Sequence, residues 1–273
     1  MVDQQKRKHQ TGSREGAIIV KVLIIVTGLL LPTLGWGAAG GNTFPHDKIE
    51  IDWDDKAAMQ RGARTFVNYC MSCHSAAYSR FNRVGEDLGI SDELVRDNLI
   101  FTTDIDGEKT KVGELMKTTM TLAYAEKAFG IAPPDLSLVA RSRGVNWLYN
   151  YLRGFYVDES RAGLGINNGV FSNVGMPHVL AELQGLQIPK YKVQDDGHGN
   201  EQEVIVGFDI IQPGSMTKSE YDQTIHDLVA FLDYLAEPYK QTRKNVGTGV
   251  IIFLFLFLIL AYALKKEYWK DIH

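Results

Sequence analysis

The chain has 273 residues, enough for one or two domains, and its 29 basic residues nearly balance its 33 acidic residues. These charges are unevenly placed. Residues 39–240 carry 29 acidic and 19 basic side chains, whereas the two ends together carry 4 acidic and 10 basic. An acidic central body argues against nucleic acid as a partner, because nucleic acid requires Lys and Arg against its phosphates. The acidic side chains would either attract a positively charged partner over long range or only keep the domain soluble.

The N-terminal segment has the order of an export signal. Five basic residues precede or open an apolar run, 22–36, and small residues follow it. This order predicts cleavage near Ala39, with an uncleaved second anchor as the alternative. We therefore expect residues 1–39 to be an export signal and residues 40–240 to be the exported domain.

Between the two ends, the pattern predicts one mainly α domain with irregular loops. Asp54 and Asp55 offer N-caps for a helix at 56–70. A looser stretch is expected next, at 75–90, followed by a short helix near 91–99 and a turn at 104–107. Three further helices are expected: one at 110–129 ending at Gly130, a short one at 135–142 capped by Asp135, and one at 145–155. The last expected elements are a loop at 160–178 and a hairpin of 189–194 with 203–211.

The strongest helical signal comes near the end of the exported domain. Thr217 with Glu220 forms a capping box that opens an amphipathic helix at 218–236, and Pro238 ends it. Apolar residues recur there at spacings of three and four, which places them on one face. These residues are Tyr221, Ile225, Leu228, Val229, Leu232 and Leu235.

Residues 246–264 form a run of 19 residues without a charge. As a helix, the run would be about 28 Å long, close to the thickness of the hydrocarbon core of a bilayer. Basic residues flank both ends, and Tyr262, Tyr268 and Trp269 suit the interface with water. We predict a transmembrane anchor with a short cytoplasmic tail at 241–273, rather than a buried core helix.

Both cysteines of the chain lie in residues 70–74, which read Cys-Met-Ser-Cys-His. The C-x-x-C-H pattern is the attachment signature of a c-type haem. Two thiols on adjacent turns can reach two vinyl groups on one edge of the porphyrin, and the following histidine then lies under the ring. We predict one covalent haem c, attached through Cys70 and Cys73, with His74 as an iron ligand.

Two other interpretations of this motif compete with haem attachment. A thiol–disulfide redox pair usually opens a helix after a strand, whereas here the pair closes an expected helix. A zinc site would need a second pair of soft ligands, which the chain lacks.

An iron that transfers electrons without binding a substrate needs a second axial ligand, and a thioether is a common choice. Met116 and Met120, at a helical spacing, suit core packing. Met176 instead lies in a Gly–Met–Pro context within an irregular loop, where the proline fixes the path of the chain. The pattern favours Met176, with Met120 second. The remaining candidates are Met216, His178, His198 and His226.

Four segments in a fixed order resemble bacterial cytochrome c1, the haem subunit of the cytochrome bc1 complex. The resemblance covers about 45–270 and implies a mainly α, elaborated class I cytochrome c domain with one C-terminal transmembrane helix. The segments are RGARTFVNYCMSCHS (61–75), APPDLSLVARSRG (132–144), NNGVFSNVGMPHVL (167–180) and LAEPYKQTRKNVG (235–247).

The resemblance also implies roles for individual residues. His74 and Met176 would be the axial ligands, and Pro133 and Pro134 would lie against the haem. Arg141 would pair with a haem propionate, which a guanidinium can bind through two bonds. A solvated helix end is the alternative for Arg141. The chain departs from some members in lacking an extra disulfide, and the residues before Pro133 lack the glycine- and asparagine-rich composition of many members.

The function that the resemblance implies is that of an electron-transfer subunit in a ubiquinol–cytochrome c oxidoreductase. The chain would accept an electron from the Rieske iron–sulfur protein and pass it to a soluble or tethered cytochrome c, without an acid–base catalytic residue of its own. It would dock on cytochrome b in a dimeric complex of the bacterial inner membrane, with the haem domain on the periplasmic side. Rival hypotheses are another tethered cytochrome c, an assembly protein that handles thiols or metal, and a five-coordinate haem enzyme or gas sensor.

Overall fold

The computed structural model describes residues 46–103, 106–161, 163–195 and 201–271. All of them belong to one unit, Asn42–His273. The predicted export signal, part of the predicted turn at 104–107 and His198 lie outside the described residues.

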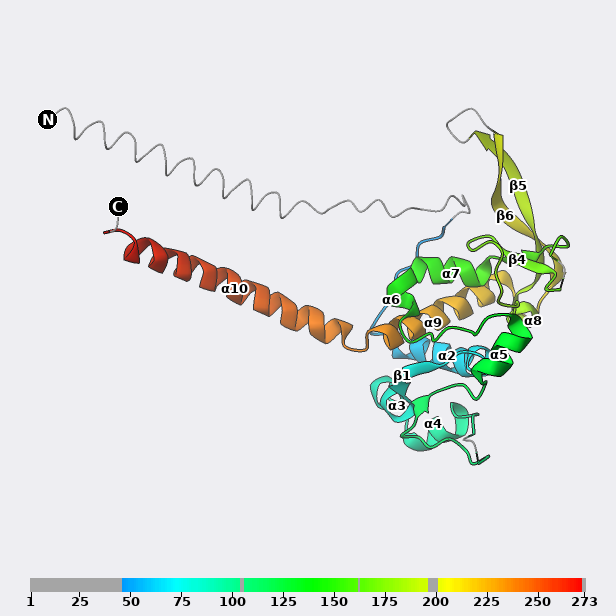
Figure 1. Cartoon of the computed structure of the whole chain (residues 1–273), viewed down its shortest axis with the longest axis horizontal. Helices are drawn as coiled ribbons and strands as arrows, with labels where there is room; N and C mark the ends of the chain where they lie inside the picture. Colours follow the sequence, from blue (N-terminus) through cyan, green and yellow to red (C-terminus); the bar gives the residue numbers. More distant parts are fainter. Residues whose placement is uncertain (1–45, 104–105, 162, 196–200, 272–273) are drawn as a thin grey trace. The chain divides into compact units, whose positions relative to one another are not determined.

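Two helices that are far apart in the sequence cross at the centre of the domain. Helix α2 (Lys56–Thr65) begins after the N-cap Asp55, and it continues as a π-helix, η1 (Phe66–Cys70). Helix α9 (Lys218–Ala236) lies between α2 and α7 (Val145–Arg153) in Figure 1. A Cβ atom at Gly62 would overlap the backbone carbonyl of Asp227, so only glycine allows this close approach.

Helix α9 has the bounds and the cap that the sequence predicts. The hydroxyl of Thr217 accepts from the amide of Glu220, and the Glu220 carboxylate accepts from the amide of Thr217. All six apolar residues of the predicted face are buried. Asp227 on the same helix is also buried, and Arg61 neutralises it through two hydrogen bonds of 2.6 and 3.2 Å.

The remaining elements surround this crossing. In chain order they are β1 (Ala76–Arg80), α3 (Phe81–Leu88), α4 (Asp92–Asn98), β2 (Leu115–Met116), α5 (Leu122–Phe129), α6 (Val139–Arg143), β3 (Phe155–Val157), β4 (Ile166–Asn168), α8 (Ala181–Gln184), β5 (Gly185–Asp195) and β6 (Glu201–Pro213). The strands form three two-stranded antiparallel sheets, β1–β2, β3–β4 and β5–β6. The domain is therefore mainly α, as predicted.

Four local predictions were wrong. The stretch at 75–90 contains β1 and α3 rather than a loose segment, and the loop at 160–178 contains the short strand β4. Helix is present only at α5 within the predicted 110–129, although Gly130 ends it in the left-handed conformation as expected. The helix predicted at 135–142 begins only at Val139, and Asp135 does not cap it.

The predicted hairpin is present and is longer than expected. Strands β5 and β6 pair from Gly185 with Pro213 to Asp195 with Glu201, with two register shifts. Its base rests on β3, where the rings of Tyr156 and Phe208 lie 6.0 Å apart.

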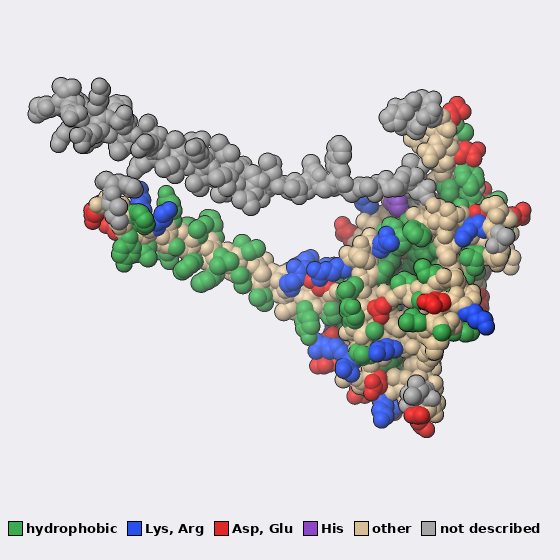
Figure 2. Space-filling model, viewed as in Figure 1, with side chains coloured by type: hydrophobic (Ala, Val, Ile, Leu, Met, Phe, Trp, Pro, Cys, Tyr) green, Lys and Arg blue, Asp and Glu red, His purple; other side chains and the backbone are tan. Residues whose placement is uncertain are grey.

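The last helix, α10 (Lys240–Tyr268), contains the whole apolar run at 246–264. It is the one helix among the described residues that is long and apolar enough to cross a membrane, and none of it is buried. Figure 2 shows apolar side chains along its length, with basic side chains near both ends. Because an exposed apolar helix is unfavourable in water, this arrangement fits a membrane anchor.

Candidate haem-binding site

The C-x-x-C-H motif follows directly from the π-helix. Helix η1 ends at Cys70, and the amides of Cys73 and His74 both donate to the Cys70 carbonyl, at 3.1 and 2.8 Å. The motif is therefore a tight turn on the end of the helix that crosses α9. This packing fixes the two thiols and the imidazole relative to the core.

The thiol of Cys70 does not have the environment of an attacking thiol in a redox-active pair. Burial, and to a lesser extent the neighbouring Cys73, raises the pKa of Cys70 to about 12. A thiol with so high a pKa is a poor nucleophile at neutral pH, whereas exchange catalysts lower the pKa of their attacking cysteine. A metal-binding cluster of three or more His, Cys, Asp or Glu side chains is also absent from the described part of the chain. The surroundings of Cys70 therefore do not favour the thiol–disulfide interpretation of the motif.

His74 is held in the orientation that an iron ligand needs. Its Nδ1 lies 2.7 Å from the carbonyl oxygen of Pro134. Since a carbonyl can only accept, Nδ1 carries the proton, which leaves the lone pair on Nε2. Burial lowers the pKa of His74, although the bond to Pro134 opposes the shift. A neutral imidazole whose second nitrogen is oriented by a carbonyl is the usual form of a histidine ligand.

The segment after Pro133 and Pro134 is fastened to the motif by a ladder of hydrogen bonds. The amide of Leu136 donates to the Ser75 carbonyl at 2.8 Å, and the Ala77 amide donates to the Asp135 carboxylate at 2.9 Å. Pro133 is half-buried, whereas the ring of Pro134 is exposed. The ladder thus brings the predicted proline pair beside His74, and it uses the Asp135 carboxylate that the sequence assigned to a helix cap.

Met176 lies half-buried in the loop after β4. The hydroxyl of Tyr151 donates to its Sδ at 3.5 Å, and burial raises the pKa of Tyr151 to about 12, so the hydroxyl stays protonated. The other methionine candidates lie in different surroundings. Met116 is part of the core, and the hydroxyl of Thr224 lies 3.6 Å from the Sδ of Met216. Met120 is partly buried beyond β2.

The histidine candidates also differ in their surroundings. His226 lies partly buried on α9, with Nε2 at 3.1 Å from the Glu50 carbonyl, as expected for a structural histidine. The ring of His178 is stacked on Phe155, with centroids 4.9 Å apart, and burial lowers the pKa of His178 to about 4. His178 is therefore neutral at pH 7, two residues after Met176.

The loop that carries Met176 is fastened by side chains rather than by regular structure. The side-chain oxygen of Asn168 accepts from the amides of Val170 and Phe171, at 2.9 and 3.1 Å. The Asn167 oxygen accepts from the amide of Asn173, a residue with a left-handed φ of 60°. The Arg161 guanidinium donates to the Val174 carbonyl at 2.6 Å.

An aromatic ladder, which the sequence prediction missed, runs from α7 to the first residue of β3, and its middle ring contacts Met176. Trp147, Tyr151 and Phe155 are spaced by four residues, with ring centroids 4.7 and 5.3 Å apart. The guanidinium of Arg143 lies over Trp147, at 5.1 Å from the ring centroid. The spacing of four between Trp147 and Tyr151 was a visible signal for a shared helical face, but nothing in the pattern linked this face to Met176.

Arg141 does not lie over Trp147 as Arg143 does, but faces Glu237. Its side chain is largely exposed, and its nearest carboxylate is Glu237, at 4.0 Å. Glu237 also pairs with Arg243 at the start of α10. In this structure, Arg143 is therefore the arginine that lies on the aromatic ladder, while pairing of Arg141 with a propionate stays a prediction.

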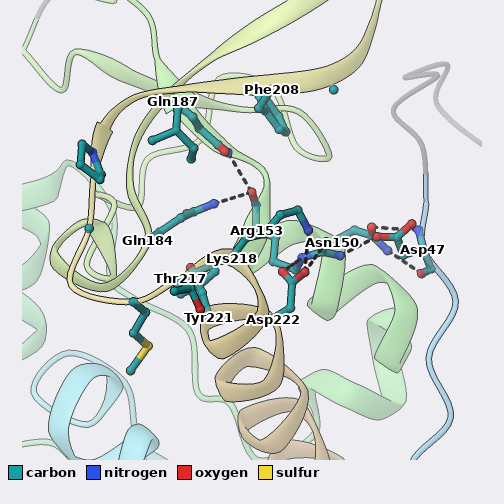
Figure 3. Close-up of a pocket in the computed structure, with 15 residues that line it drawn as sticks. Asp47, Asn150, Arg153, Gln184, Gln187, Phe208, Thr217, Lys218, Tyr221 and Asp222 are labelled. Carbon is teal, nitrogen blue, oxygen red and sulfur yellow. Dashed lines mark hydrogen bonds and ion pairs between the residues drawn. The ribbon is translucent and has the colours of Figure 1, made fainter.

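A separate cavity of about 460 Å³ lies between the base of the hairpin and the first turn of α9. Figure 3 shows Arg153 at its centre, with the side chains of Gln184 and Gln187 both donating to the Arg153 carbonyl. The guanidinium of Arg153 pairs with Asp222 at 2.6 Å and with Asp47 at 2.7 Å. The guanidinium of Arg153 is thus already neutralised, and no residue of the Cys70–His74 motif lines the cavity. The cavity is therefore a structural feature apart from the predicted haem site.

The kinds of donor that the predicted site residues offer fit a haem. The motif offers two thiols at the attachment spacing and an imidazole with a free Nε2 lone pair, and a separate loop offers a thioether that is bonded to the ring hydroxyl of Tyr151. The family model described as "Cytochrome C1 family" matches residues 44–272. The chain belongs to the cytochrome c1 family. Cytochrome c1 is the haem subunit of the bc1 complex, so haem c binding, electron transport and membrane anchoring come with the family.

Individual relatives agree with this membership. The chain is 42% identical to the cytochrome c1 of Allochromatium vinosum over 254 residues, which are 93% of this chain and 100% of the relative. It is 45% identical over 257 residues to a Nitrosomonas europaea protein named ammonia monooxygenase gamma subunit, covering 93% and 99%. The cytochrome c1 of Rhodospirillum rubrum is 27% identical over 282 residues, covering 93% and 98%. The prediction of a bacterial cytochrome c1 is confirmed.

Proposed function

We propose that this chain accepts an electron from the Rieske iron–sulfur protein and passes it to cytochrome c through one covalently bound haem. The observation that carries the proposal is the pairing of the Cys70–His74 motif with a Pro134 carbonyl that leaves His74 Nε2 free for a metal. When bound, the haem supplies a one-electron couple. The chain itself contributes attachment, axial ligands and surroundings, and no acid, base or nucleophile.

Each predicted site residue has a distinct task in this proposal. Cys70 and Cys73 hold the group covalently, and His74 and Met176 are the two axial ligands. A thioether ligand and an apolar, hydrogen-bonded surrounding favour a high potential. Pro133 and Pro134 line the group on the histidine side, where the Pro134 carbonyl also orients His74.

Arg141 is proposed to neutralise a propionate, and the nearby Arg143 is available for the same task. Both residues lie at the last turn of α6, where two cations are close in sequence. A guanidinium that pairs with a propionate stabilises its negative charge beside an apolar pocket.

The proposed location is the bacterial inner membrane. Residues 1–39 would direct export and be cleaved, residues 40–240 would form the periplasmic haem domain, and residues 241–273 would anchor it and end in the cytoplasm. The support is the exposed apolar helix α10 together with the basic and apolar order of the N-terminal segment.

The proposed partners are cytochrome b, which would contact the anchor, the Rieske protein and a soluble or tethered cytochrome c. The acidic central body would attract a basic cytochrome c over long range. We also propose that the complex is dimeric and that no nucleic acid is bound. The name of the Nitrosomonas europaea relative suggests a second candidate, association with an ammonia monooxygenase.

A reduced-minus-oxidised spectrum of the full-length protein in detergent, with a haem stain after denaturing electrophoresis, tests the proposal. We expect a sharp c-type α-band and a stain that stays on the denatured chain. Both should disappear in the Cys70→Ala/Cys73→Ala variant. A correctly exported wild-type protein without stain, and with two freely titrating thiols, would refute the cytochrome function.

Co-purification separates the two candidate complexes. An affinity tag on this chain, with mild detergent, should bring down a b-type haem and an iron–sulfur protein in a fixed ratio. Recovery of an ammonia monooxygenase instead would favour the second candidate.

A further inference from the structure

Tyr151 contacts the ligand loop at two points. Its side-chain hydroxyl donates to the Sδ of Met176 at 3.5 Å. Its backbone carbonyl accepts from the side-chain amide of Asn168 at 2.8 Å. Asn168 lies at the start of the loop and Met176 near its end, so one residue of α7 fixes both the beginning of the loop and the sulfur that the loop carries.

The ring of Tyr151 is itself held in place. It stacks on Trp147 with an interplanar angle of 11° and meets Phe155 edge-on, at a centroid distance of 5.3 Å. Phe155 in turn stacks on His178, which follows Met176 by two residues. Because rings on both sides confine it, the hydroxyl has a defined direction, and that direction is toward the sulfur.

Building on the proposed function, we propose that Tyr151 is a positioning residue for the Met176 ligand. Its hydroxyl holds the Sδ in place and withdraws electron density from it. A thioether with less electron density stabilises ferric iron less than ferrous iron, and hydrogen bonds to ligand sulfurs are a recognised means of tuning potential. The hydroxyl of Tyr151 therefore raises the midpoint potential of the site.

The test compares Tyr151→Phe with Tyr149→Phe in the full-length holoprotein. Tyr151→Phe keeps the ring, its stacking and the backbone bond to Asn168, and it removes only the hydroxyl. Tyr149 lies on the same helix with its ring over the Arg153 guanidinium, at 4.3 Å, and none of the hydrogen bonds or ring contacts among the described residues joins it to Met176. Two quantities are measured: the midpoint potential, and the charge-transfer absorption that marks a methionine sulfur on ferric iron.

We expect Tyr151→Phe to lower the midpoint potential and to shift the sulfur absorption. The net worth of one hydrogen bond corresponds to a roughly two- to tenfold fall in the ferrous-to-ferric ratio at a fixed ambient potential. Tyr149→Phe should retain the wild-type values of both quantities.

The outcomes separate this inference from the proposed function. If the wild-type protein shows the sulfur absorption but Tyr151→Phe leaves it and the midpoint unchanged, this inference fails and the ligand assignment stands. The inference also fails if Tyr151→Phe lowers only the melting temperature and keeps the wild-type midpoint potential, because Tyr151 would then have a purely structural role. A wild-type protein without the sulfur absorption would overturn both the Met176 assignment and this inference.

Discussion

The two sides of the proposed haem site are built in different ways. The histidine side is a turn on the end of a core helix, and its bonds to the Pro134–Leu136 segment include main-chain pairs such as Leu136 to Ser75. The methionine side is a loop without regular structure, held by Asn167, Asn168, Arg161 and the hydroxyl of Tyr151.

This difference has a consequence for stability. A ligand on a core helix shares the stability of the whole domain, whereas a loop fastened by a few side chains can open while the domain stays folded. We therefore expect the histidine side to lose its structure only when the whole domain unfolds. The loop on the methionine side should open while the rest of the domain stays folded. Variants on the two sides can break or sharpen this comparison.

The largest effect is expected at the helix crossing that supports the histidine side. Gly62→Ala would force α2 away from α9, because the new methyl group overlaps the Asp227 carbonyl. The free energy of unfolding should fall by about 3 kcal/mol, with both sides lost in one transition. Denaturant unfolding followed by circular dichroism and by haem absorption measures this loss. Gly113→Ala is the control, since a Cβ there has no neighbour within 4 Å; equal stability of the two variants would contradict the packing argument.

The next effect is expected on the methionine side. Asn168→Ala removes the acceptor for the Val170 and Phe171 amides and the donor to the Tyr151 carbonyl. The loss should be about 2 kcal/mol, concentrated in the loop. The reduced variant should bind carbon monoxide while its haem stays covalently attached. Asn68→Ala, which removes an exposed bond to the Arg64 carbonyl, should not bind it. Global unfolding of Asn168→Ala without a ligand-accessible folded state would show that the loop is not an independent unit.

A smaller effect is expected for Asp135→Ala on the histidine side. The variant loses the acceptor for the Ala77 and Ser137 amides, at 2.9 and 2.8 Å, in an exposed position. About 1 kcal/mol of stability should be lost, and no carbon monoxide should bind, because the Pro134 carbonyl still orients His74. Carbon monoxide binding by Asp135→Ala would mean that the histidine side also opens locally.

The smallest expected quantity is the coupling between the two sides. Asp135 and Asn168 share no bonding partner among the described residues. The double variant should therefore lose the sum of the two single losses, within about 0.5 kcal/mol. A larger deviation in a double-mutant cycle would show that the two sides stabilise each other.

The sequence predicted best where the signal was local. The capping box at Thr217 and the apolar spacing along α9 gave the correct bounds, because a helix start and a buried face are both encoded within a few residues. The Cys70–His74 motif likewise placed the histidine side at the end of a helix.

Prediction failed where distant residues decide the conformation. The helix predicted at 110–129 does not extend before Leu122, since the Thr118 hydroxyl and amide bond instead to Ser72 and Ser75. Asp135 was predicted as a helix cap, but its carboxylate bonds to the Ala77 amide, 58 residues away in the sequence. The role of Tyr151 could not be found, because its partner is a sulfur 25 residues along the chain.

Only three residues, 237–239, separate α9 from α10. Even fully extended, such a connection reaches only about 10 Å. Lys240, the first residue of α10, also holds the start of this helix against the domain. Its ammonium pairs with Asp233 at 2.8 Å and lies over the ring of Trp53, at 4.6 Å from the centroid. A haem domain on so short a tether has a small radius of travel and stays at high effective concentration near the membrane surface. Under the proposed function, the partners would therefore have to come to this domain and carry the electron over any longer distance.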